Sequence, residues 1–258
     1  MLVPNNKVDT INSKKDSGIW GPWPTVGFGV AIFAVYVIVQ SIAIVIFAVV
    51  SLVSDPTLSI LQLAQNISNN GLAIAISIYP STIVGVGLIF VFIRARTGVN
   101  IREYLGIKSI TKKTTLVLLS IPPLLIVLLE LVSALFKSSS SQFMIDIYRT
   151  SIWPVFLWLA VVIFAPIFEE TFFRGFLFVG LKQSRIGSVG TIALTTLLWA
   201  LLHVQYDVYT MSTIVVLGVI LGIVRLKSDS LWSPLLIHSF WNLLAMVQTA
   251  LYLNGIIS

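Results

Sequence analysis

The chain lacks cysteine altogether and carries few charged residues. None of its 258 residues is cysteine, which excludes disulfide bonds, thiolate metal ligands and a cysteine nucleophile. Only 10% of the residues are charged, whereas 57% are hydrophobic, and the mean hydropathy is +0.99. A soluble domain needs more charge than this to cover its surface, so we expect an integral membrane protein surrounded by lipid.

Long apolar segments alternate with short polar connections along the chain. There are seven of them: 26–53, 72–93, 115–136, 152–181, 188–205, 211–226 and 231–253. A transmembrane helix needs about 20 apolar residues, and Pro166 is a point where the long fourth segment can kink or divide. The sequence therefore predicts an all-α, polytopic transmembrane helical bundle with about seven to eight spans. A cytoplasmic tail at 1–24 is expected to precede a single membrane domain at 25–258.

The net charge of +6 is distributed as a topology signal rather than as a nucleic-acid-binding patch. Connections rich in Lys and Arg alternate with poor ones; the rich ones are 1–24, 94–114, 182–185 and 225–227, and the poor ones are 54–71, 137–149, 206–210 and the C-terminus. Positive connections stay in the cytoplasm. We therefore expect a multi-pass protein, in the cell membrane if bacterial, with a cytoplasmic N-terminus and an external C-terminus. Its expected partners are membrane lipid and a membrane-associated substrate, and no nucleic acid is expected.

Six ionisable side chains lie inside the apolar segments, apart from Arg225, which is counted with the connection 225–227. They are Glu130, Glu169, Glu170, Arg174, His203 and His238, and they include both histidines and three of the four glutamates of the chain. Burying such groups in lipid costs several kcal/mol each, on the order of 3 kcal/mol on insertion scales. By default they face the interior of the bundle and indicate a functional site.

The first pattern within this set is an acidic pair followed by an arginine. Arg174 comes four residues after Glu170, so on a helix the two side chains share one face and can pair. Glu169 is rotated by about 100° from Glu170 and is left for another partner. Adjacent carboxylates repel each other, which is one way to prepare a general base. A purely structural ion pair between helices is the alternative.

Two further patterns place a histidine on an apolar helix. Trp199 precedes His203 by four residues, and His238 precedes Asn242 by four residues. The second spacing puts two hydrogen-bond donors on one helix face, as a tetrahedral oxyanion requires. Each pattern taken alone is equally compatible with a polar contact between helices.

Taken together in this order, the three patterns resemble the CAAX protease and bacteriocin-processing family, also called the CPBP or Abi family. Its signature of EExxxR, FxxxH and HxxxN is matched by Glu169 to Arg174, by Trp199 to His203 and by His238 to Asn242. The resemblance covers a catalytic core at about 150–245. Trp199 stands where the family usually has phenylalanine, which keeps an aromatic wall but changes the shape of the pocket.

This resemblance implies an intramembrane endopeptidase of the kind that processes the C-termini of CAAX prenyl proteins, or bacterial peptides in bacteriocin immunity. Carried over, Glu169 would be the base that activates water, with His203 assisting it. His238 and Asn242 would stabilise the oxyanion, while Glu170 and Arg174 would orient Glu169. No cofactor is required in this scheme, although Glu169, His203 and His238 are also a set that zinc can use. We favour the metal-free scheme, because Asn242 suits an oxyanion donor better than a zinc ligand.

Two other classes of function are compatible with parts of the sequence. A non-catalytic self-immunity protein would bind a bacteriocin peptide or its receptor without cleaving it. A transporter could use the same Glu and His residues as a proton relay, but the presence of all three patterns argues against it. Activity of a Glu169 or His238 variant distinguishes an enzyme from a binder.

The distribution of Lys and Arg leads to a direct test of topology. Reporter fusions after residue 105 should read as cytoplasmic, whereas fusions after residue 62 or at the C-terminus should read as external. The expectation follows from the positive-inside rule applied to seven crossings. A C-terminal fusion that reads as cytoplasmic would contradict the count of seven.

Overall fold

Long helices make up most of the structure, a computed structural model that describes residues 18–96, 98–136 and 142–256. Six of its helices are long and apolar enough to cross a membrane: α1 (Pro22–Ser54), α3 (Gly71–Arg94), α5 (Lys112–Phe136), a composite helix at Pro154–Leu181, α11 (Val208–Ser228) and α12 (Trp232–Leu253). A shorter apolar helix, α10 (Gly187–Ala200), continues into the 3₁₀ turn η4 (Leu201–His203). No strand occurs in the described ranges. The predicted all-α bundle is therefore confirmed, and about seven to eight spans is approximately consistent with these helices.

Short helices connect the long ones. They are α2 (Ile60–Asn66), η1 (Ile67–Asn69), α4 (Ile101–Leu105) and α6 (Gln142–Arg149). Polar side chains begin several helices by accepting from backbone amides that have no partner in the first turn. Asn70 accepts from the amide of Ala73 at the start of α3, and Asp207 accepts from that of Thr210 at the start of α11.

The composite helix changes its winding along its length without interruption. It runs through α7 (Pro154–Leu159), the π-helical η2 (Ala160–Phe164), α8 (Ala165–Glu169), the π-helical η3 (Glu170–Leu177) and α9 (Phe178–Leu181). A break at Pro166 was one of the two outcomes expected for this segment, but the chain stays helical through it. Pro166 has no amide hydrogen to donate, and the wider π turn before it lets the helix continue past this residue. Such π turns often occur at functional sites.

Close helix packing depends on small residues at the contact points. A Cβ on Gly85 of α3 would lie 2.5 Å from the Phe168 ring of the composite helix. A Cβ on Gly218 of α11 would lie 2.8 Å from Thr196 of α10, and Gly222 has Ile192 equally near at 2.9 Å. Helices in lipid associate through such small residues, because their backbones can then approach each other closely.

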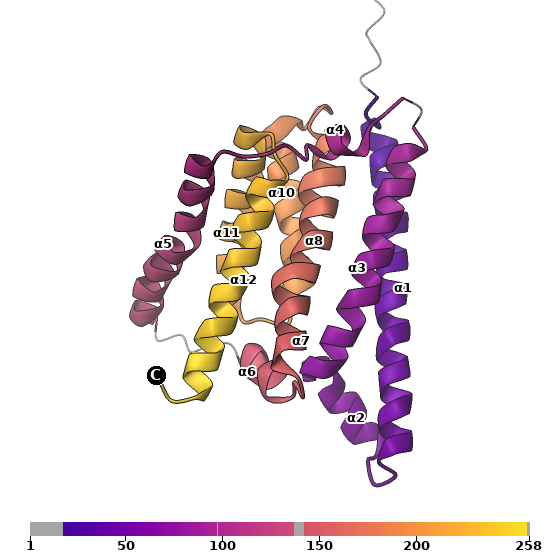
Figure 1. Cartoon of the computed structure of the whole chain (residues 1–258), viewed down its shortest axis with the longest axis vertical. Helices are drawn as coiled ribbons and strands as arrows, with labels where there is room; N and C mark the ends of the chain where they lie inside the picture. Colours follow the sequence, from indigo (N-terminus) through magenta and orange to yellow (C-terminus); the bar gives the residue numbers. More distant parts are fainter. Residues whose placement is uncertain (1–17, 97, 137–141, 257–258) are drawn as a thin grey trace, which may run out of the picture.

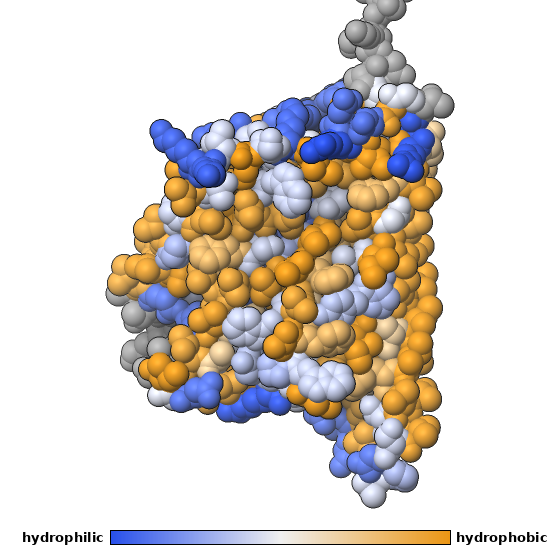
Figure 2. Space-filling model, in the orientation of Figure 1, coloured by the Kyte–Doolittle hydropathy of each residue, from blue (hydrophilic) through white to orange (hydrophobic). Residues whose placement is uncertain are grey.

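Polar side chains lie at both ends of the bundle. Figure 2 shows hydrophobic side chains over most of the height of one face, with hydrophilic side chains at the end that carries α4 and others at the opposite end. The described part of the chain begins with α1 near the end that carries α4 and finishes at the opposite end with α12 (Figure 1). Opposite ends fit an odd number of crossings, with α10 as the seventh. The side of the membrane that each end faces stays a prediction, and most of the predicted tail at 1–24 lies outside the described residues.

The Gly85 contact leads to a test of the fold. Gly85→Leu should destabilise the bundle by about 1–3 kcal/mol, because the new side chain must displace the buried ring of Phe168. Gly87→Leu in the same helix is the matched control, since a Cβ there meets no atom within 4 Å. Thermal unfolding of the two purified variants in detergent gives the comparison. Equal midpoints would contradict the packing described.

Candidate active site

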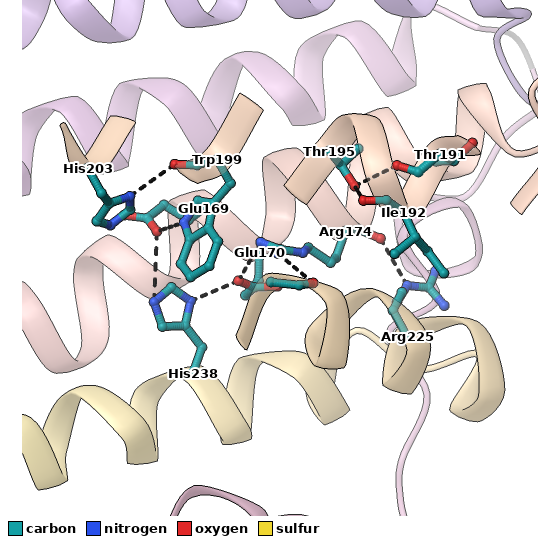
Figure 3. A network of polar contacts seen from close by, with 11 residues as sticks. Glu169, Glu170, Arg174, Thr191, Ile192, Thr195, Trp199, His203, Arg225 and His238 are labelled. Carbon is teal, nitrogen blue, oxygen red and sulfur yellow. Dashed lines mark hydrogen bonds and ion pairs between the residues drawn. The ribbon is translucent and has the colours of Figure 1, made fainter. Parts of the chain in front are cut away.

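The three sequence patterns meet at one place inside the bundle. Glu169 and Glu170 come from the composite helix, Trp199 and His203 from α10 and its terminal turn, and His238 from α12 (Figure 3). The three helices thus bring together residues that lie up to 69 positions apart in the sequence. The arrangement places two carboxylates and two imidazoles together inside the bundle.

Glu169 is held on one of its two carboxylate oxygens. Its Oε2 accepts a hydrogen bond of 2.5 Å from the indole nitrogen of Trp199, and lies 3.8 Å from Nε2 of His238 (Figure 3). The side chain is 15% exposed, which distinguishes it from the fully buried Glu170. Glu169 is therefore the carboxylate that a water molecule and a substrate can reach.

The carboxylate of Glu170 is hydrogen-bonded to side chains inside the protein. Its Oε1 accepts from NH1 of Arg174 at 3.1 Å and from Nδ1 of His238 at 2.8 Å. Arg174 also donates to the carbonyl of Gly218 at 3.2 Å and lies over the ring of Trp199, 4.8 Å from its centre. Both charged side chains are 0% exposed. The predicted ion pair between Glu170 and Arg174 is confirmed, and it fixes the ring of His238 from the side opposite Glu169.

His203 lies at the edge of the site and is oriented by its own helix. Its Nδ1 lies 3.0 Å from the carbonyl of Trp199, which can only accept, so this nitrogen carries the proton and Nε2 has the lone pair. Its ring stacks near Tyr206, with 6.2 Å between the ring centres. Tyr206 contacts α6 through Met144 and Phe143, so α6 borders this side of the site.

Asn242 holds a backbone carbonyl of the composite helix. Its amide nitrogen donates to the carbonyl of Val161 at 2.9 Å. In the π turn the amide of Ala165 bonds the carbonyl of Ala160, and the next amide in line would belong to Pro166, which has no hydrogen. Asn242 therefore satisfies the carbonyl that the proline leaves open. One of its two amide hydrogens is used in this way, and the second is free for another acceptor.

A side chain of α11 stabilises the second π turn in the same way, by donating to a free carbonyl. The amide of Phe178 bonds the carbonyl of Phe173, five residues back, whereas that of Lys182 bonds Phe178, four residues back. A change from five-residue to four-residue steps leaves one carbonyl unpaired, which is costly inside a membrane. The carbonyl of Arg174, next after Phe173, accepts from Nε of Arg225 at 3.0 Å.

Arg225 is a residue whose part in the site the sequence analysis missed. It was counted among the cytoplasmic connection charges, but it lies within α11 and is 1% exposed. It also donates to the carbonyl of Leu105 at 3.2 Å and pairs with Asp229 at 3.3 Å. Hydrogen bonds from Arg225 and Lys108 hold the pKa of the Asp229 carboxyl below its ordinary value, with that from Lys108 the larger cause. An arginine in the last turn of an apolar helix, four residues before an aspartate, was the available signal.

The site offers no ready-made metal cage. Within the described residues, no group of three or more His, Asp or Glu side chains lies close enough together to hold a metal ion. Nδ1 of His203 and of His238 is bonded within the protein, as is usual for histidines that bind metal through Nε2, so these contacts do not argue against zinc. As arranged, however, the side chains of Glu169, His203 and His238 do not form a group close enough to hold the ion. The zinc alternative stays a prediction for metal analysis.

The buried ion pair and the exposed base should respond differently to mutation. Arg174→Ala leaves the carboxylate of Glu170 buried without its cation, and we expect a loss of about 3–5 kcal/mol of stability. Glu169→Gln keeps the size of the side chain and an acceptor for Trp199, so it should leave folding nearly intact. The amount of folded protein in membranes, by size-exclusion profile after extraction, makes the comparison. Equal losses from both would favour a purely structural role for the acidic pair.

The comparison with known protein families agrees with this geometry. Residues 151–244 match the family model described as type II CAAX prenyl endopeptidase Rce1-like. The residues predicted to form the catalytic site all lie inside that range: Glu169, Glu170, Arg174, His203, His238 and Asn242. No curated protein and no solved structure matches the chain. The long apolar helices make the chain an integral, multi-pass membrane protein, and its residues 151–244 are similar to the Rce1-like type II CAAX prenyl endopeptidases.

Proposed function

We propose that this protein is a glutamate-type intramembrane endopeptidase that hydrolyses a peptide bond of a membrane-associated protein or peptide. The observation that carries the proposal is the contrast between the two adjacent glutamates. Glu170 is fully buried against Arg174, whereas Glu169 is partly exposed and lies beside His238. One carboxylate is thus used for structure and the other is available for chemistry. The family match to prenyl endopeptidases supports a prenylated CAAX substrate.

The proposed reaction begins with proton transfer. Glu169 takes a proton from a water molecule, and the hydroxide attacks the carbonyl carbon of the scissile bond. The carbonyl oxygen becomes an oxyanion as the tetrahedral intermediate forms. The C–N bond then breaks, and the proton held by Glu169 passes to the leaving nitrogen. Glu169 is regenerated as a carboxylate, so protons and bonds balance.

His238 and Asn242 are the proposed donors to the oxyanion. Nδ1 of His238 already donates to Glu170, so donation from Nε2 requires the doubly protonated ring. The carboxylates of Glu169 and Glu170 counter the positive charge of that ring. Asn242 would use the amide hydrogen that Val161 does not occupy. Preorganised donors of this kind stabilise charge that develops only in the transition state.

His203 is proposed to assist the base. Its Nε2 carries a lone pair, because Nδ1 donates to the Trp199 carbonyl, and it can accept a hydrogen bond from the attacking water. The aromatic contacts with Trp199 and Tyr206 hold the plane of the ring. The ring is therefore set for orienting water and needs no rotation during the reaction.

Two substitutions test this scheme on a fluorescence-quenched farnesylated CAAX peptide. Glu169→Gln should be nearly inactive, because an amide cannot accept the proton. Asn242→Ala should lower kcat by about a hundredfold or more with little change in KM. It also frees the carbonyl of Val161, so rates must be normalised to folded protein. Trp153→Phe is the control, since Trp153 is 66% exposed.

Metal content decides between this scheme and the zinc alternative. Purified active protein should carry no stoichiometric zinc and should keep its activity after chelation. A metal-dependent scheme would be correct instead if the wild-type protein contains zinc that His203→Ala loses, and if added zinc restores the activity of the chelated wild-type protein. If Glu169→Gln keeps a cellular immunity phenotype at normal expression, the non-catalytic binder becomes the better description.

A further inference from the structure

Trp199 contacts four of the six residues proposed for the site. Its indole nitrogen donates to Oε2 of Glu169, and its carbonyl accepts from Nδ1 of His203. Its ring meets those of His203 and His238 edge to face, with 5.0 Å and 5.1 Å between ring centres. The guanidinium of Arg174 lies over its face. Phenylalanine could make the ring contacts but could not donate the hydrogen bond.

The surroundings of Trp199 fix the direction of its N–H. The side chain is 1% exposed. Gly218 lies behind the ring, and a Cβ at that position would be 3.1 Å from Cε3 of the indole. Arg174, His203 and His238 surround the remaining faces and edges (Figure 3). The indole therefore has no space to turn its N–H away from Glu169.

The two oxygens of Glu169 are consequently different. Oε2 receives the indole N–H and faces Nε2 of His238. No hydrogen bond to Oε1 is present among the described residues, although the side chain is 15% exposed. A carboxylate oxygen that already accepts a short hydrogen bond has less electron density for a new proton than its free partner. Oε1 is thus the oxygen open to water.

We propose that Trp199 is a positioning residue that holds Oε2 of Glu169 and thereby makes Oε1 the oxygen that takes the proton from water. The proposal rests on the proposed function of Glu169 as the base. The indole does not touch the reacting atoms, and it acts by limiting rotation of the carboxylate. Reacting groups must be held close to their productive geometry, because small displacements reduce rates strongly. Loss of the N–H should therefore affect kcat rather than KM.

The test removes the indole N–H of Trp199 and keeps the shape of its side chain. Replacing Trp199 by 3-benzothienylalanine exchanges the N–H for sulfur in a ring of nearly the same size. We expect kcat on the farnesylated CAAX peptide to fall about tenfold to a hundredfold, the range for loss of a hydrogen bond to a charged group. KM should stay within about twofold, because the pocket wall is kept. Trp199→Phe should show the same fall in kcat, and the Trp153→Phe control should not.

A second measurement follows the hydrogen bond without any substrate. In protein labelled with ¹⁵N at its indoles, the Trp199 signal is the one that Trp199→Phe removes. It should lie downfield, as a short hydrogen bond requires, and should move upfield in Glu169→Ala. Glu103→Ala, on the short helix α4, is the matched control and should leave it in place.

The outcomes separate this proposal from the function on which it rests. An inactive Glu169→Gln together with a fully active benzothienylalanine protein would overturn the role of Trp199 alone. So would a Trp199 signal that does not move in Glu169→Ala. An active Glu169→Gln, or a wild-type protein that does not hydrolyse the peptide, would overturn the proposed function, while the indole signal would still report whether Glu169 is held.

Discussion

The buried pair of Glu170 and Arg174 is the interaction on which the rest of the site depends. A fully buried charge is costly in an apolar bundle unless it is paired and hydrogen-bonded. Here the pair is extended by His238, by the Gly218 carbonyl and by the face of Trp199. Each of these partners comes from a different helix than the pair itself. The requirement to satisfy two charges therefore draws α10, α11 and α12 around the composite helix, and the neighbouring Glu169 is left at the edge where it can be reached.

The sequence predicted the helices well, because long apolar runs have few structural solutions in lipid. The expected segment at 72–93 became α3 at Gly71–Arg94, and that at 231–253 became α12 at Trp232–Leu253. The pairing of Glu170 with Arg174 followed from helical spacing alone. The resemblance to the CPBP family predicted that Glu169, His203 and His238 belong to one site, and all three are in contact with Trp199.

The details that the sequence did not reveal are those that involve a change of winding or a contact between distant helices. The sequence pattern around Pro166 does not indicate whether this proline kinks the helix or is accommodated by a π turn. The decision depends on Asn242, which lies 76 positions further along the chain and supplies the missing donor. Arg225 was counted as an interfacial charge for the same reason, because the carbonyls of Leu105 and Arg174 to which it donates lie far away in the sequence. The role of the indole N–H of Trp199 could not be predicted either, because it depends on a contact with Glu169 on another helix.

The two π turns also set the angular phase of the catalytic helix. Each π turn accommodates one residue more than an α-helical turn, so removing the first would rotate every later residue by about 100°. This is the angle that separates Glu169 from Glu170 on a helix. The side chain of Asn242, which holds the carbonyl left open by the first turn, thus takes part in selecting which of two chemically identical neighbours pairs with Arg174 and which is left partly exposed. A residue deleted between Val161 and Glu169 would bring Glu170 to the position of Glu169, and an inserted residue would bring Glu169 to the position of Glu170.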